Sequence, residues 1–134
     1  MADWASHEKS PNERGTGATW EITFYEDILK RHPDYVEVLS LLGGLYTRNR
    51  MHAEGLKVDQ RLATLKEDDP IVHYNLACSY SLLNQPNRAF EALERAMALG
   101  YMDADHMDKD GDLDNVRADP RYARATSRMR AAKH

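Results

Sequence analysis

Apolar residues in the stretch 70–99 recur at helical spacing in two successive groups. They fall on one face of each of two predicted helices: Leu76, Ala77 and Tyr80 on the first, and Ala89, Leu93 and Ala96 on the second. The sequence Asn84-Gln85-Pro86 separates the groups, and this combination is typical of a turn. The pattern therefore predicts a helical hairpin.

The same pattern occurs once more, earlier in the chain and at a constant interval. Leu42, Gly43 and Tyr46 stand in the places of Leu76, Ala77 and Tyr80, and Gly55 and Leu62 stand in those of Ala89 and Ala96. We call the separation of Leu42 and Leu76 the repeat interval. A fixed interval of this length indicates a repeat architecture, with a first repeat expected at residues 34–69 and a second at residues 70–100.

Within the first repeat, the first helix should bury a stripe formed by Val38, Leu39, Leu42, Leu45 and Tyr46. Gly43 would let a neighbouring helix approach closely. The second helix, at about residues 51–66, is expected to bury Leu56, Val58, Leu62 and Leu65. Its pattern is weaker than that of the second repeat, because Gly55 and Asp59 stand where alanine and a large apolar residue are expected.

The stretch before the repeats resembles the second helix of a hairpin. Trp20, Phe24 and Ile28, with Tyr25 and Leu29 beside them, recur at helical spacing before Pro33. This predicts a half-repeat helix at residues 19–32 that caps the N-terminal end of the stack. Residues 1–18 are polar and are expected to form a flexible arm.

The C-terminal part divides into an acidic and a basic stretch. Seven aspartates lie between residues 103 and 119, whereas every charged residue from Arg121 to Lys133 is an arginine or a lysine. We expect an acidic loop at residues 101–118. Pro120 can start a C-terminal capping helix at residues 119–131, with Tyr122, Ala125, Met129 and Ala132 on its apolar side.

Composition narrows the classes of function. With 134 residues, 42% hydrophobic and 30% charged, the chain is expected to form one helical domain at residues 19–134. A net charge of −4 argues against nucleic-acid binding. Cys78 is the only cysteine, which excludes an internal disulfide. The absence of a long apolar run argues against a membrane role, and a cytoplasmic location is expected.

These residues resemble the tetratricopeptide repeat (TPR) family, whose first helix carries Leu, Gly or Ala, and Tyr, and whose second carries two alanines around a large apolar residue. The C-terminal part is similar to a closing segment of bacterial proteins of this kind, through Gly100-Tyr101, residues 110–113 (Asp-Gly-Asp-Leu) and residues 117–122 (Arg-Ala-Asp-Pro-Arg-Tyr). The resemblance implies an all-α, right-handed stack of antiparallel hairpins that binds proteins, with no catalytic residues and no cofactor.

In such a stack the first helices line a concave face that would bind a protein or peptide partner. The candidate contact residues are Glu37, Ser40, Leu41, Gly44, Arg48, Ile71, Tyr74, Asn75, Cys78 and Leu82. The apolar members suggest a covered face. An external peptide or helix, the chain's own C-terminal segment, or a second copy could cover it. A monomer is expected, with a homodimer as the alternative.

The aspartates at residues 103–119 also suggest a calcium- or cation-responsive module, because alternating oxygen ligands occur in EF-hand loops. The spacing departs from that loop, since Leu113 stands where the required glycine belongs. We therefore expect no specific metal site, but retain cation response as the alternative function. An enzyme is the third alternative, and no cluster of acid, base and nucleophile supports it.

Overall fold

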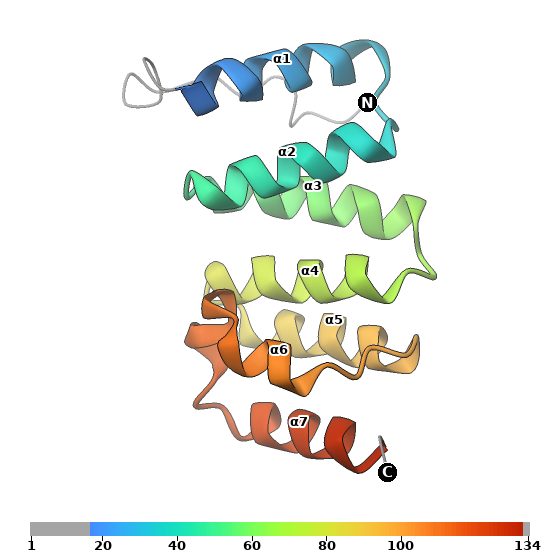
Figure 1. The fold of residues 1–134 in the computed structure, drawn as a ribbon, viewed down its shortest axis with the longest axis vertical. Coiled ribbons are helices and arrows are strands. Elements are labelled where there is room, and N and C mark those ends of the chain that lie inside the picture. The colour runs from blue at the N-terminus through green and yellow to red at the C-terminus, as the bar shows by residue number, and fades with distance from the viewer. Residues whose placement is uncertain (1–16, 133–134) are drawn as a thin grey trace. The chain divides into compact units, whose positions relative to one another are not determined.

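The computed structural model describes residues 17–132, and the predicted arm at residues 1–18 therefore lies almost entirely outside the described residues. Within the described range the chain is all-helical and contains no strand, which confirms the predicted all-α class (Figure 1). The elements are α1 (Gly17–Arg31), α2 (Val36–Arg48), α3 (His52–Leu65), α4 (Pro70–Leu82), α5 (Pro86–Ala98), α6 (Ala104–Lys109), the 3₁₀ helix η3 (Gly111–Val116) and α7 (Pro120–Ala132).

The helices divide into two compact units. Unit 1 contains the described residues up to Leu65, and unit 2 contains those from Lys66 onward. Each unit includes one of the two predicted hairpins, α2–α3 or α4–α5, with bounds close to those expected from the apolar pattern. The expectation that residues 19–134 form a single domain stays a prediction.

In unit 1, α2 packs against both α1 and α3. All five residues of the predicted stripe on α2 are buried, as are Val58 and Leu62 on α3. A Cβ atom added to Gly43 would lie 3.4 Å from Val58 Cγ1 and 3.5 Å from Asp59 Oδ1, which is the close helix packing expected of this glycine. Leu56 and Leu65 are only half-buried.

The side of α1 formed by the apolar pattern of Trp20, Phe24 and Ile28 is not its buried side. Trp20 and Phe24 are 68% and 48% exposed, whereas Ile22, Glu26 and Leu29 form the buried side. The helix turns a polar residue inward because the Glu26 carboxylate accepts a hydrogen bond from the Tyr46 hydroxyl group of α2. The apolar pattern showed the large aromatic residues, but it could not show a buried hydrogen bond between residues far apart in the sequence.

The two hairpins share their turn geometry. Arg50 and Asn84, which stand one repeat interval apart, both have positive φ angles, of 59° and 57°. The next amide in each turn donates to the tyrosine carbonyl oxygen of the preceding helix, from Met51 to Tyr46 at 2.8 Å and from Gln85 to Tyr80 at 2.9 Å. The repeat seen in the side-chain pattern is therefore also present in the backbone.

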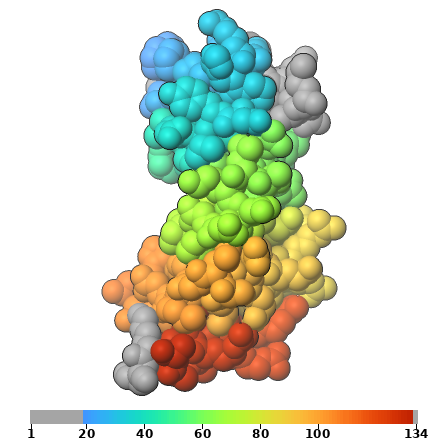
Figure 2. All heavy atoms as spheres, turned by 90° about the vertical axis from the view of Figure 1, so that its right-hand side faces the viewer, coloured from blue at the N-terminus to red at the C-terminus, as the bar shows by residue number. Residues whose placement is uncertain are grey.

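The remainder of unit 2 differs from the expected loop. Residues 101–118 contain the helices α6 and η3. Met107 of α6 and Leu113 and Val116 of η3 have buried side chains. Helix α7 begins at Pro120 as predicted and buries Tyr122, Ala125 and Met129, but Ala132 is exposed. In the space-filling view, the orange atoms that precede α7 lie directly against the yellow-green atoms of α4 (Figure 2).

Candidate functional site

The predicted partner-binding residues divide between α2 of unit 1 and α4 of unit 2. On α2, Glu37, Ser40, Leu41 and Arg48 are exposed and Gly44 is half-buried. On α4, Ile71 and Asn75 are exposed, Leu82 is half-buried, and Tyr74 and Cys78 are buried. The partner-binding role of all ten residues stays a prediction, but their accessibility differs strongly between the two helices.

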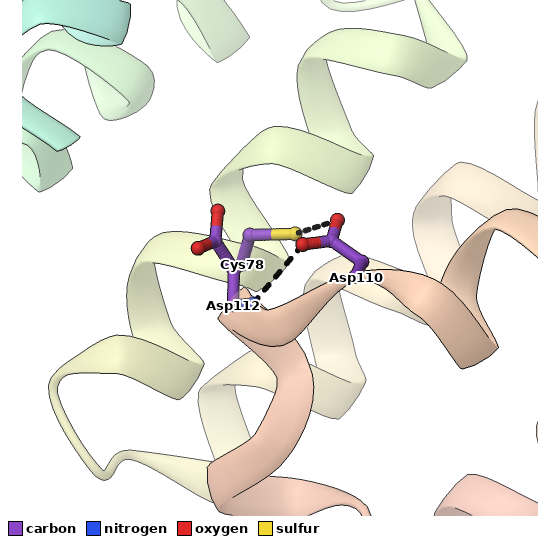
Figure 3. A group of neighbouring side chains, drawn as sticks. All are labelled: Cys78, Asp110 and Asp112. Atoms are coloured by element: carbon purple, nitrogen blue, oxygen red, sulfur yellow. Dashed lines mark hydrogen bonds between the residues drawn. The ribbon is translucent and has the colours of Figure 1, made fainter. Parts of the chain in front are cut away.

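Tyr74 and Cys78 are buried beneath the segment formed by residues 101–116, which we call the cover segment. The Tyr74 hydroxyl group donates a hydrogen bond of 2.5 Å to Asp110 Oδ2. The Cys78 thiol lies 3.7 Å from the same oxygen (Figure 3). Further along α4, Asn115 Nδ2 donates to the Ser81 carbonyl oxygen at 3.0 Å. The chain's own C-terminal part thus covers this side of α4.

Aromatic contacts fix the start of the cover segment. The rings of Tyr74 and Tyr101 stack with their centroids 4.4 Å apart and an interplanar angle of 9°. His106 lies with its ring centroid 5.7 Å from that of Tyr74, and its Nε2 is 3.5 Å from Asp110 Oδ2. The tyrosine of α4 therefore contacts the cover segment through both its ring and its hydroxyl group.

Several of the aspartates in this region cap helices or join ion pairs. Asp103 accepts from the His106 amide at the start of α6, and Asp110 accepts from the Asp112 amide at the start of η3. Asp114 pairs with Arg117, and Asp119 pairs with Arg121. The two caps satisfy helix ends that would otherwise leave backbone amides without acceptors.

Arg117 joins the cover segment to α7. Its guanidinium group donates to the carbonyl oxygens of Met107 and Asp110, at 3.0 and 2.7 Å, and to the Tyr122 hydroxyl oxygen at 2.7 Å. Tyr122 in turn donates to Asp108 at 2.7 Å. A single side chain therefore holds the end of α6 to the first turn of α7.

The electrostatics of this region favour neutral side chains on α4. Burial is the main cause that raises the pKa of the Cys78 thiol well above its usual range, and the Asp110 carboxylate adds to it. Burial is also the main cause that raises the pKa of Tyr74. Burial likewise raises the pKa of Tyr101, to about 12. The thiol is therefore held in its protonated form, which is a poor nucleophile.

One group of side chains among the described residues could supply ligands to a metal ion. Single ligand atoms of Cys78, Asp110 and Asp112 all lie within 4.8 Å of one another (Figure 3). A thiol must lose its proton to bind a metal, and the raised pKa of Cys78 opposes that loss. Asp110 is also engaged by Tyr74 and by the Asp112 amide. The arrangement thus fits a closed packing contact better than an open ligand site.

The sequence singled out Tyr74 and Cys78 on α4 but not their contacts in the cover segment. The contacts of Asp110, Asn115 and Arg117 join positions up to 36 residues apart, and no periodic pattern reports such pairs. The available signals were the Asp-Gly-Asp-Leu string at residues 110–113 and the Arg-Ala-Asp-Pro string at residues 117–120. These strings indicated an ordered ending, and covering of the predicted face by the C-terminal segment was one of three alternatives that the sequence left open.

No family model matches the chain, and no solved structure matches it significantly. The chain is similar to a chloroplastic protein of Arabidopsis thaliana, with 33% identity over 75 residues. The match covers 54% of this chain and 22% of that protein, so the chain spans only a small part of that relative's length. Among the described helices, none combines the length and apolar character needed to cross a membrane.

Proposed function

We propose that this chain is a non-catalytic protein-binding module built from TPR-like hairpins. The support is the repeat interval, which appears in the Leu, small residue and Tyr pattern and in the matching turns at Arg50 and Asn84. The finer proposal is a right-handed stack in which α2 and α4 line one face, with α1 and α7 as caps. A bacterial, cytoplasmic setting is part of the same proposal.

The accessibility of α2 carries the proposal. Leu41 is 52% exposed on the outward side of α2, between exposed Glu37 and exposed Arg48. Gly44 is half-buried, and the Arg48 side chain lies over it, with Nη1 3.4 Å from the position that a Cβ atom would take. An apolar side chain flanked by one acidic and one basic residue suits a peptide or helix with an apolar anchor and charges at either end.

The α4 part of the surface is used differently in this proposal. Tyr74 and Cys78 already contact the cover segment, so a partner can reach them only after that segment leaves. Ile71, which is 54% exposed, and Asn75 remain accessible in its presence. An external partner therefore binds through α2, whereas on α4 only Ile71 and Asn75 stay open to contact.

Site-specific photo-crosslinking tests this proposal. A photoreactive amino acid at Leu41, in the full-length chain expressed in its native cells, should give a discrete crosslinked species. The same amino acid at the exposed Ala53 of α3 serves as the control and should give none. Equal products at both positions, or no product at Leu41, would rule out the α2 surface as the binding site.

The cation-responsive alternative is tested by calcium titration. If the aspartates of residues 103–119 serve a cation, then calcium should raise the melting temperature and shift the amide resonances of the cover segment. We expect neither change, since Asp103, Asp110, Asp114 and Asp119 already accept hydrogen bonds within the chain. A saturable shift at those amides would favour the alternative.

A further inference from the structure

Helix α1 carries an exposed apolar side that its packing in unit 1 does not use. The rings of Trp20 and Phe24 stack at 5.5 Å with an interplanar angle of 6°. They lie on the side of α1 opposite Ile22, Glu26 and Leu29, the residues that are buried. Two large aromatic side chains that support each other at a surface are typical of a contact region.

The repeat register indicates what kind of element this side accepts. Phe24 and Ile28 stand where Val58 and Leu62 stand in α3, and where Ala92 and Ala96 stand in α5. Those four residues of α3 and α5 are buried in the hairpins, where α3 packs on α2 and α5 packs on α4. The corresponding side of α1 is therefore shaped to receive an antiparallel helix.

The chain's own preceding sequence lacks the pattern of such a helix. Residues 2–14 stand where α2 and α4 stand in the register. They carry Glu8, Lys9 and Asn12 in the places of the Leu, small residue and Tyr, and they include Pro11, a residue type that is unfavourable inside a helix. The sequence before α1 therefore does not repeat the pattern of the first helices of the two hairpins.

The exposed side of α1 is complementary to itself. Glu21, Phe24, Ile28 and Arg31 follow one another at spacings of three, four and three, which places them along one strip of the helix. Ile28 is half-buried at the edge of this strip, and the other three residues are exposed. If two copies of α1 pair antiparallel about a two-fold axis level with residue 26, Glu21 faces Arg31 of the other copy. The same pairing places Phe24 opposite Ile28 of the other copy. Residues 21 and 31 are equally distant from residue 26, and so are residues 24 and 28.

We propose that two copies of this chain associate through the exposed side of α1, forming a two-fold dimer. Phe24 and Ile28 form its apolar centre, and two Glu21–Arg31 pairs close its ends. Trp20, at the flank, can stack on the guanidinium group of Arg31 of the other copy. Such an isologous contact uses the same surface on both chains and therefore closes at two copies. The dimer goes beyond the binding function proposed above, and departs from the monomer expected from the sequence.

Sedimentation velocity on the full-length chain over a range of concentrations tests the dimer. The wild-type chain should shift from monomer to dimer as its concentration rises, and Phe24→Glu should remain monomeric. Tyr35→Glu is the matched control, because Tyr35 is 46% exposed in the same unit but lies outside α1, and it should dimerise as the wild type does. A wild-type chain that stays monomeric would overturn the proposal.

Charge reversal tests the predicted pairing itself. Glu21→Arg and Arg31→Glu should each raise the dimer dissociation constant by about tenfold, because each places like charges opposite one another twice per dimer. The double variant restores opposite charges and should return close to the wild-type value. Circular dichroism should show unchanged helicity in all three variants, since both side chains are exposed. A dimer that is insensitive to the single changes, or is not restored by the double change, would place the interface elsewhere and contradict the proposal.

Discussion

At the scale of single residues, Tyr74 and Tyr101 show how similar side chains can have different energetic roles. Their rings stack on each other, and both are buried. The Tyr74 hydroxyl group donates to a carboxylate at 2.5 Å, whereas that of Tyr101 donates to the Asp103 carbonyl oxygen at 3.4 Å. Hydrogen bonds to charged acceptors are stronger than those to neutral ones, and they weaken with distance.

Tyr74→Phe should therefore lower the free energy of unfolding by about 1–2 kcal/mol, since it leaves Asp110 without its tyrosine donor. Tyr101→Phe is the matched control, and it should cost only a few tenths of a kcal/mol because its hydrogen bond is long. Urea denaturation followed by circular dichroism measures both values. Equal losses in the two variants would show that the Tyr74–Asp110 contact contributes no specific stability.

Asp119 provides a prediction about pH. The hydrogen bonds from the Arg121 side chain, followed by the one from its amide, lower the pKa of Asp119 to about 2. Because the folded pKa lies below the unfolded value of about 3.9, the stabilisation is present above about pH 4 and is lost as the pH falls toward about 2. Carboxyl NMR titration should give a midpoint of about 2, rising toward about 3.9 in Arg121→Met. In Asp119→Asn, the free energy of unfolding should fall less steeply as the pH is lowered from about 4 to about 2. An unchanged pH dependence would show that Asp119 does not contribute to it.

At the scale of helices, the two helices of the second hairpin both begin with proline but are capped differently. Pro70 and Pro86 both stand at the first position of their helices, where the missing amide costs little. Asp69 caps α4 by accepting from the amides of Ile71 and Val72, at 2.9 and 3.4 Å. Gln85, at the same position before α5, makes no side-chain cap. The two helix starts are therefore a natural pair for comparison.

Asp69→Ala should destabilise the chain by about 1 kcal/mol, the usual cost of losing an N-terminal cap. Gln85→Ala should change the free energy of unfolding by a few tenths of a kcal/mol at most, because no cap hydrogen bond is lost there. Thermal and urea unfolding of both variants provide the comparison. A loss at Gln85 as large as that at Asp69 would show that the cap is not the cause.

At the scale of the chain as a whole, the C-terminal third is divided between two tasks. The cover segment packs against α4, whereas α7 contacts α5 and α6. Removal of residues 119–134 would therefore expose surfaces of α5 and α6, whereas the contacts of Asp110 and Asn115 with α4 lie outside the removed residues. A change within the cover segment is needed to open that side of α4.

Leu113→Ala provides this change, because Leu113 is 2% exposed within η3. The cavity should cost about 2–4 kcal/mol and raise the population in which the cover segment is open. The single thiol, Cys78, reports that opening, since it is buried beneath the segment. Labelling by a thiol reagent under native conditions should be slow in the wild type and at least about tenfold faster in Leu113→Ala. Leu41→Ala, at a position 52% exposed, should leave the rate unchanged, and an equal rate in all three chains would contradict the cover.

The sequence by itself determined the two hairpins and α7, whereas it predicted a loop in the place of α6 and η3. The apolar stripes of α2 and α4, the prolines at the starts of α4, α5 and α7, and the repeat interval are local signals, because they depend on neighbouring helical turns or on direct repetition. They located the two hairpins and α7 within a few residues. They also selected Leu41, a candidate contact residue that the structure leaves exposed on α2.

Only the tertiary structure decided which sides of these helices are covered. Glu26 rather than Trp20 turns inward because its carboxylate accepts from Tyr46, which lies 20 residues later. Tyr74 and Cys78 are buried because Asp110, which follows Tyr74 by 36 residues, returns to α4. Such polar contacts have no period along the chain. They exist only when folding brings distant residues together, so periodicity predicts a helix but not what its outer side contacts.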